Sequence, residues 1–193
     1  PSDLCHEAAK LAIADAGLQP TDIDQIIVAT VTPDTMFPAT ACRIQDSLGC
    51  RQVPSFDLTA ACSGFIYALA VGRTAVAAGT AEHVLVVGGE TLTRITDYTD
   101  RGTCILFGDG AGAAVLSRVD NSVPGIIDTH MASDGSGGNL MILPASGSRL
   151  PATRQTVDEK LHFTRLNGRA VYKNAISKNV MLVNESLARC NLT

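Results

Sequence analysis

Runs of apolar, largely β-branched residues, separated by segments of helical spacing, most constrain how this chain can fold. One run spans residues 26–31 and another 84–89, and a shorter strand is predicted over 53–58. Continuous apolar runs of this kind are typical of strands buried on both faces. Helices are predicted between and before these strands, over 3–16, 38–48 and 64–78. The alternation predicts an α/β fold, with a parallel sheet covered by helices on both faces.

Serine, proline and glycine residues mark the ends of these predicted helices. Ser2 is expected to cap the first helix, and Pro38 to begin the second. Gly17, Gly49 and Gly79 follow the three helical segments, where glycine commonly ends a helix. These signals predict where each helix begins and ends.

The pattern changes after the third apolar run. Three further strands are predicted, over 103–107, 113–119 and 125–130. A glycine-rich turn is predicted at 108–112, and segment 132–160, rich in Gly, Ser and Pro, is expected to be a long excursion. A final helix is predicted from about Arg169 to Cys190.

The glycine-rich segment 108–113 invites comparison with a dinucleotide-binding loop. Such a loop needs a strand before it and a helix after it. Residues 113–119 instead have the pattern of a strand. We therefore interpret the segment as a tight turn with close backbone packing.

Composition excludes several classes of protein. The chain has 193 residues, of which 46% are hydrophobic and 18% charged, values typical of one well-buried globular core. The net charge is −4 and no basic run occurs, so binding to nucleic acid or an anionic membrane has little electrostatic support. No uninterrupted apolar stretch reaches the roughly 18 residues of a membrane helix, and no signal peptide is recognised.

One cysteine stands apart from the others by its position. A strand is predicted to deliver Cys62 to the first turn of a long helix, where unpaired N–H groups and the helix dipole favour a thiolate. Its own N–H could help to hold a developing oxyanion. The alternative is a buried structural cysteine that opens an Ala-rich helix. No C-x-x-C pair or zinc-finger spacing occurs, so five cysteines are interpreted as small buried hydrophobic residues: Cys5, Cys42, Cys50, Cys104 and Cys190.

A nucleophile normally needs a base nearby. His83 precedes a predicted buried strand, at the edge opposite to the one where open α/β sheets bind ligands. His6 is expected on a solvated helix face, and His162 lies beside apolar residues. None of these histidines, nor His130, is expected to be the catalytic base.

The residues around Cys62 resemble those of a known family. Asp57–Phe65 (DLTAACSGF) is similar to the active-site cysteine segment of β-ketoacyl-ACP synthase III enzymes. Thr99–Thr103 (TDRGT) and Leu106–Ala113 (LFGDGAGA) resemble the next diagnostic stretch of that family. Met131–Gly135 and Asn167–Lys173 continue the match in order. The likeness covers nearly the whole chain, and the ordered combination is highly specific.

The resemblance implies a thiolase-like fold, layered α-β-α, with a mixed, largely parallel sheet. Residues 1–120 would form the N-terminal half, incomplete at its start. Residues 121–193 would form the connecting excursion and the first helix of a truncated C-terminal half. Both ends of the chain are expected to be cuts, because the last helix should lead into another strand.

By resemblance, the chain is a condensing enzyme that begins fatty-acid synthesis. Acetyl-CoA, or another short acyl-CoA, would acylate Cys62. Malonyl-ACP would then be decarboxylated, and its carbanion would attack the thioester to give β-ketoacyl-ACP, CoA and CO2. No cofactor is implied, since the CoA thioesters are substrates. A homodimer in the cytoplasm, of bacterial or plastid type, is expected.

The resemblance also assigns roles to five other residues. Arg101 matches an arginine that contacts the CoA nucleotide. Leu92 and Phe107 match lining residues of the primer pocket. Phe37 matches the residue that reaches across the dimer to close the partner's pocket. Lys173 matches a basic residue that helps to dock the acidic carrier protein. Four of the five have a simpler interpretation: core packing for Leu92 and Phe107, surface pairing for Arg101 and a solvated position for Lys173.

Other parts of the family's site have no counterpart in these 193 residues. A His and an Asn that polarise the malonyl thioester would lie beyond residue 193, as would a second oxyanion N–H. A Trp and an Arg that hold the CoA adenine are also absent, and the chain has no Trp. These 193 residues alone are therefore expected not to complete condensation.

Two alternatives remain from the sequence. One is another enzyme of the same fold: a 3-hydroxy-3-methylglutaryl-CoA synthase, a polyketide synthase or a synthase for longer acyl chains. The other is a non-catalytic thiolase-fold partner that binds acyl groups in a heterodimer. Such a partner would not need a thiol at position 62, so the presence of Cys62 favours the enzyme.

Overall fold

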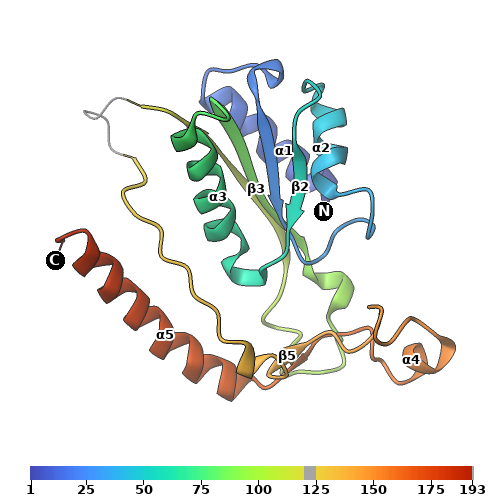
Figure 1. Ribbon diagram of the computed structural model, residues 1–193. Coiled ribbons are helices and arrows are strands. Elements are labelled where there is room, and N and C mark those ends of the chain that lie inside the picture. Colours follow the sequence, from blue (N-terminus) through green and yellow to red (C-terminus); the bar gives the residue numbers. More distant parts are fainter. Residues whose placement is uncertain (120–124, 193) are drawn as a thin grey trace. The chain divides into compact units, whose positions relative to one another are not determined.

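A computed structural model describes residues 1–119 and 125–192 of the chain (Figure 1). The chain forms two compact units. The first unit comprises residues 1–91 and 109–126, and the second comprises residues 92–108 and 127–193. The predicted boundary between residues 120 and 121 lies outside the described residues.

The first unit is built on a four-stranded sheet with the order β2-β1-β3-β4. β1 pairs in parallel with both β2 and β3, whereas β3 and β4 are antiparallel. The prediction of a mixed, largely parallel sheet is confirmed. The strands are β1 (Gln25–Ala29), β2 (Ser55–Leu58), β3 (His83–Thr91) and β4 (Asp109–Ser117).

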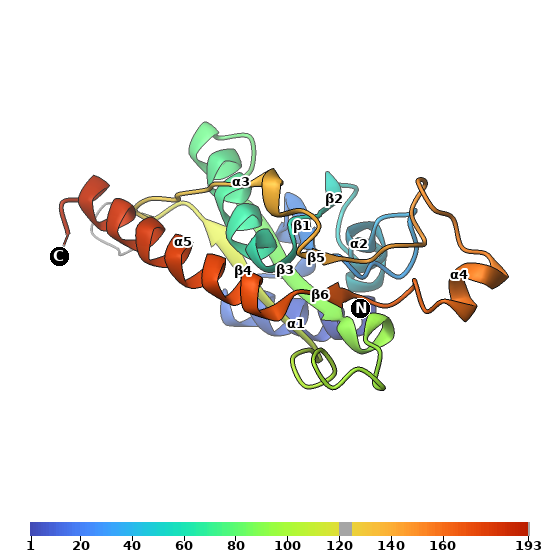
Figure 2. The ribbon, with the colours of Figure 1, turned by 90° about the horizontal axis from the view of Figure 1, so that it is seen from below.

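Helices cover both faces of this sheet (Figure 2). α1 (Ser2–Asp15) and α2 (Thr40–Leu48) pack on one face, and α3 (Gly64–Ala78) packs on the other. A short 3-10 helix, Pro20–Asp22, leads from α1 to β1. Gly49 and Gly79 end α2 and α3 in the left-handed conformation, which confirms both predicted helix ends.

The two faces of the central strands enter two separate cores. In β1, Ile26 and Val28 pack against α1 and α2, while Ile27 and Ala29 pack against α3. Successive side chains on a strand point to opposite faces, so a strand covered on both sides must be apolar at every position. This explains the uninterrupted apolar runs in the sequence.

The second unit contains shorter elements. Its helices are the 3-10 turns Leu92–Ile95 and Gly135–Gly137, α4 (Arg154–Asp158) and α5 (Gly168–Arg189). β5 (Met141–Ile142) and β6 (Arg165–Leu166) form an antiparallel pair. The Asn167 side chain accepts the N–H of Ala170 and so caps α5, close to the predicted start of the last helix.

Three predicted elements in the middle of the chain are wrong. Residues 103–107 form turns and no strand, because the N–H of Cys104 donates to Asp100 and that of Leu106 to Thr103. The predicted turn at 108–112 is instead the beginning of β4, since a strand ladder uses backbone groups and needs no side chains. Residues 125–130 are not a strand either.

Two predicted helix starts are also wrong. Pro1, not Ser2, is the N-cap of α1, and the Ser2 hydroxyl donates to Asp34 at 3.0 Å. α2 begins at Thr40 and not at Pro38, because the carboxylate of Asp57 accepts the first N–H groups at that point.

One helical stretch among the described residues, Ala61–Ala78, has the length and composition of a membrane span. It includes α3, whose Ala68 and Val76 are buried against the sheet. A core helix of a layered α/β unit meets the same criteria, so composition does not identify this stretch as a membrane span.

Candidate active site

The carboxyl ends of three neighbouring parallel strands meet at one edge of the first unit. Ala29, which ends β1, pairs with Leu58 of β2 on one side and with Gly88 of β3 on the other. Open α/β sheets bind their ligands at this edge. Three polar segments follow at that edge: Thr30–Thr32 after β1, Thr59–Ser63 after β2, and Glu90–Thr91 at the end of β3.

Cys62 lies in the turn that joins β2 to α3. Ala61, Cys62 and Ser63 form a 3-10 turn that leads directly into α3 at Gly64. Ala61 has a φ of 47°, a left-handed conformation that costs free energy for a residue with a Cβ and tends to occur at functional sites. A Cβ on Gly64 would lie only 3.1 Å from Cβ of Ala29, so glycine lets α3 begin close to β1.

The Cys62 side chain is a free, exposed thiol that borders an open cavity of about 280 Å³. Small residues form most of the cavity wall, so atoms of a ligand could approach the sulfur closely. Phe65 and Glu90 are its larger lining residues. The small lining residues include Ala29, Gly88, Gly89, Ala111 and Gly112.

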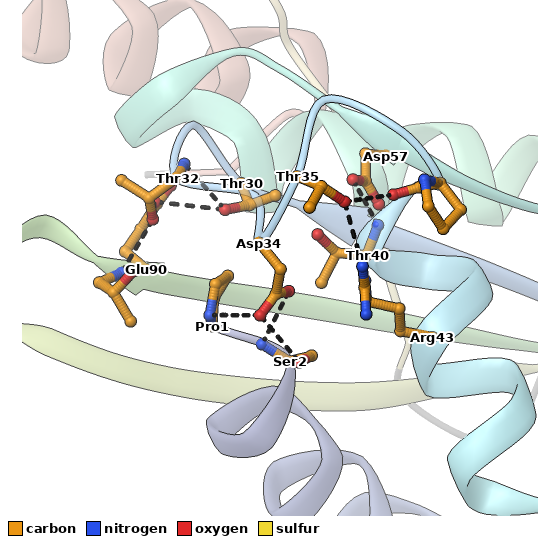
Figure 3. Close-up of polar contacts among 12 residues, drawn as sticks. Pro1, Ser2, Thr30, Thr32, Asp34, Thr35, Thr40, Arg43, Asp57 and Glu90 are labelled. Carbon is orange, nitrogen blue, oxygen red and sulfur yellow. Dashed lines mark hydrogen bonds and ion pairs between the residues drawn. The ribbon is translucent and has the colours of Figure 1, made fainter. Parts of the chain in front are cut away.

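A carboxylate in this cavity carries a dense set of hydrogen bonds (Figure 3). Glu90 accepts hydrogen bonds from Thr30, Val31 and Thr32, the residues that directly follow β1. Asp57, on β2, accepts the backbone N–H groups of Thr40 and Ala41 at the start of α2. Reasoning from the sequence did not identify either carboxylate as part of the site. The feature that could have identified them is an acidic residue at or near the carboxyl end of a predicted parallel strand.

The second unit carries a loop folded by its own aspartates, residues 97–103. Asp100 accepts the N–H of Gly102 at 2.9 Å and the hydroxyl of Thr103 at 2.9 Å. Hydrogen bonds from the hydroxyl and N–H of Thr99, and then from Lys160, lower the pKa of Asp97 to about 2. The two aspartates are thus engaged within the loop or by Lys160. No ion pair of the described residues uses the exposed Arg101.

The predicted site residues are divided between the two units. Cys62 and Phe37 belong to the first unit, where Phe37 is exposed in the loop before α2 and does not line the Cys62 cavity. The others belong to the second unit. Leu92 and Phe107 are half-buried, and Arg101 and Lys173 are exposed.

His83 lies where the sequence suggested, whereas His6, expected on a solvated helix face, is half-buried. His83 begins β3, at the end opposite to Glu90, and its Nδ1 lies 2.8 Å from the hydroxyl of Ser117. His6 on α1 lies 2.8 Å from the Ser47 hydroxyl. Within the part of the chain that the structure describes, no group of three or more His, Cys, Asp or Glu side chains could hold a metal ion.

Comparison with known proteins decides the family. Residues 56–135 match the family model of 3-oxoacyl-[acyl-carrier-protein] synthase III. The β-ketoacyl-[acyl-carrier-protein] synthase III of Caldanaerobacter subterraneus subsp. tengcongensis is 48% identical over 192 residues, which are 100% of this chain and 58% of that protein. The chain belongs to the 3-oxoacyl-[acyl-carrier-protein] synthase III family.

Solved structures of the synthase III family and its relatives confirm the thiolase-like fold. The synthase III of Pseudomonas aeruginosa PAO1 has a TM-score of 0.84 and 34% identity, over 99% of this chain and 56% of that one. The priming β-ketosynthase of the R1128 polyketide pathway has a TM-score of 0.81 and 34% identity, over 98% of this chain and 55% of that one. The chain spans just over half the length of the relatives it matches.

The synthase III family model covers some of the predicted site residues and not others. Cys62, Leu92, Arg101 and Phe107 lie within the matched residues 56–135, whereas Phe37 and Lys173 lie outside them. Glu90 also lies within the matched segment.

Proposed function

We propose that the protein is a β-ketoacyl-ACP synthase III that condenses a short acyl-CoA with malonyl-ACP. The observation that supports this proposal best is the exposed thiol of Cys62 in a cavity lined by small residues, at the ligand-binding edge of the sheet. Membership of the synthase III family agrees with it.

In the first step, the Cys62 thiolate attacks the thioester carbonyl of acetyl-CoA. A new carbon–sulfur bond forms at Cys62, the bond to CoA breaks, and the CoA thiolate leaves. Cys62 lies at the N-terminal end of α3, where backbone N–H groups can stabilise the oxyanion of the tetrahedral intermediate.

In the second step, malonyl-ACP loses CO2, and the resulting carbanion attacks the acyl thioester on Cys62. A carbon–carbon bond forms, the thiolate of Cys62 is released, and the product is β-ketoacyl-ACP. The two steps need no cofactor, because both substrates are already activated as thioesters.

We assign the remaining contacts by the same resemblance. Arg101 binds the CoA nucleotide, and its exposed guanidinium on a loop of fixed shape is suited to a phosphate. Leu92 and Phe107 line the primer pocket, and Lys173 helps to dock the acidic carrier protein.

The assembly and location of the protein belong to the same proposal. The protein acts as a homodimer in which Phe37, exposed here, closes the partner's pocket. It works in the cytoplasm, on acetyl-CoA and malonyl-ACP.

Peptide mass spectrometry tests the proposal. The longest natural polypeptide that contains this chain is incubated with acetyl-CoA and digested, and the mass of the peptide that carries Cys62 is measured. An acetyl thioester on that peptide is expected, and Cys62→Ser should abolish it. Cys42→Ser, which alters another exposed cysteine, should not. Folded protein without an adduct would contradict a short acyl primer.

A second candidate is a priming synthase of another pathway that takes a longer acyl chain; the likeness to the priming β-ketosynthase of the R1128 polyketide pathway supports a role outside fatty-acid synthesis. Octanoyl-CoA in the same experiment distinguishes the two. A preference for octanoyl transfer to Cys62 would identify the longer primer, and no transfer from either thioester would support a non-catalytic acyl-binding partner.

A further inference from the structure

We propose that Glu90 is a positioning residue of this active site. Its carboxylate holds the loop that follows β1 in one conformation, and so sets the shape of the cavity in front of Cys62 and the position of Phe37. The consequence for acyl transfer rests on the proposed function, whereas the structural part does not.

Glu90 occupies a suitable place for this role. It lies near the carboxyl end of β3, is half-buried, and lines the same cavity as Cys62. A half-buried carboxylate is costly unless its oxygens accept hydrogen bonds. The hydrogen bonds that compensate Glu90 come from one segment, Thr30–Thr32 (Figure 3).

Both oxygens of Glu90 are engaged. Oε1 accepts the backbone N–H of Val31 at 2.8 Å. Oε2 accepts the Thr30 hydroxyl at 3.3 Å and also the hydroxyl of Thr32. One side chain therefore binds three consecutive residues that follow the neighbouring strand, β1. These hydrogen bonds restrain the direction in which the chain continues towards Phe37.

The directions of the hydroxyl protons are fixed by their other partners. The Thr30 hydroxyl accepts the N–H of Thr32 at 3.1 Å, and the Thr32 hydroxyl accepts the N–H of Thr91 at 2.8 Å. Each hydroxyl thus has its own proton to donate to Glu90. Position 90 consequently needs a group that accepts at both atoms, which a carboxylate does and an amide does not.

The network continues to the segment that carries Cys62. The N–H of Thr30 donates to the Leu58 carbonyl at 3.2 Å, and the Thr59 hydroxyl donates to the Thr30 carbonyl at 3.4 Å. Thr59 begins the turn that presents Cys62. Glu90 and Thr30 therefore connect the carboxyl ends of β3, β1 and β2.

The engagement of both Glu90 oxygens argues for positioning and against proton transfer. A general base needs an oxygen available to the proton that it removes. Both oxygens of Glu90 already accept hydrogen bonds from the protein, so Glu90 acts through the loop that it holds.

The test compares Glu90→Gln with Glu90→Asp and wild type in the longest natural polypeptide that contains this chain. Because small misplacements at a reacting centre cost large factors in rate, we expect Glu90→Gln to lower acetyl transfer to Cys62 roughly tenfold. The ratio of acetyl to octanoyl transfer should change as well, which loss of stability alone would not cause. Glu90→Asp, which keeps both acceptors, should retain more of the wild-type rate and ratio.

Amide hydrogen exchange provides a readout that is independent of function. Glu90→Gln should increase exchange in the peptides that contain Val31, Thr32 and Thr91. The matched control is Glu82→Gln, an exposed glutamate just before the other end of β3, which should leave these peptides and the acyl transfer unchanged. Wild-type exchange and an unchanged transfer ratio in Glu90→Gln would overturn the positioning role.

A milder pair covers the case in which Glu90→Gln does not fold. Thr32→Val removes one hydroxyl donor at nearly constant volume, and Thr32→Ser keeps it. We expect Thr32→Val to change exchange and the transfer ratio in the same direction as Glu90→Gln, and Thr32→Ser to resemble wild type. Equal behaviour of Thr32→Val and Thr32→Ser would contradict the network.

Wild-type protein that accepts no acyl group at Cys62 would instead contradict the proposed function. The exchange data would still decide the role of Glu90 in that case.

Discussion

The carboxylate of Asp57 binds the N-terminus of α2 at Thr40, across 17 positions of sequence. Oδ2 accepts the N–H of Thr40 at 2.8 Å, and Oδ1 accepts the next N–H, that of Ala41, at the same distance (Figure 3). The first N–H groups of a helix have no partner within the helix, and a carboxylate there also interacts favourably with the helix dipole. Asp57 thereby joins β2, which leads to Cys62, to the helix that follows the Phe37 loop.

Replacement of this cap should destabilise the protein. We expect Asp57→Ala to lower the free energy of unfolding by about 1–2 kcal/mol, because two N–H groups lose their acceptor. Asp57→Asn keeps one acceptor and should cost less. Chemical denaturation measures both. Asp46→Asn, on the exposed side of the same helix, is the control, and an equal loss in the control would count against a specific cap.

The close approach of α1 to β3 depends on Gly89. A Cβ built on Gly89 would lie 2.1 Å from Sγ of Cys5, which is buried under the strand. We expect Gly89→Ala to destabilise the protein by about 1–3 kcal/mol through overpacking. Cys5→Ala in the same chain should recover part of that loss, because the second substitution removes the clashing sulfur.

Gly110→Ala is the matched control for this pair. Gly110 lies on the neighbouring strand β4, and a Cβ there would meet nothing within 4 Å. Thermal unfolding of the single and double variants measures the coupling. Additive effects of Gly89→Ala and Cys5→Ala would show that the clash is relieved by movement of α1.

The elements with the clearest periodicity could be predicted from the sequence, and those fixed by distant contacts could not. The β1 and β3 runs and the glycine ends of α2 and α3 depend on local rules, so they were found. The sequence predicts a turn at the glycine-rich start of β4, whereas pairing with β3 imposes an extended form there. Local propensity carries no information about such a partner.

The same distinction applies to the site. Cys62 could be identified because a strand, a turn and a helix follow one another around it within a few residues. Glu90 was missed, although it lines the same cavity, because its partners at Thr30–Thr32 lie about 60 positions away. Only the parallel pairing of β1 with β3 brings these residues together.

Cysteine reactivity should follow burial. Burial raises the pKa of Cys5 to about 11, and it raises the pKa of Cys50 as well, so both should remain thiols in the folded protein. Cys62 and Cys42 are exposed. We expect iodoacetamide at pH 8 to modify the two exposed residues first, as measured by the masses of their peptides. Modification of Cys5 as fast as that of Cys62 would contradict the packing of α1 on the sheet.

The salt bridge between Lys160 and Asp97 should give the loop 97–103 a defined response to acid. Nζ of Lys160 lies 3.0 Å from Oδ2 of Asp97 and 2.7 Å from the Thr99 hydroxyl. The pKa of Asp97 is lowered from 3.8 to about 2, so the stabilising contacts are fully present above about pH 4 and are lost as the pH falls through 2. The hydrogen bond from the Thr99 hydroxyl is the largest cause of the lowered pKa, and Lys160 adds a hydrogen bond and its charge, so both Thr99→Val and Lys160→Met should raise the pKa of Asp97. Carboxyl-carbon NMR titration measures these pKa values, with Lys10→Met in the first unit as the control. A wild-type Asp97 that titrates near 3.8, or two variants that leave its pKa unchanged, would show that the loop is not held by these contacts.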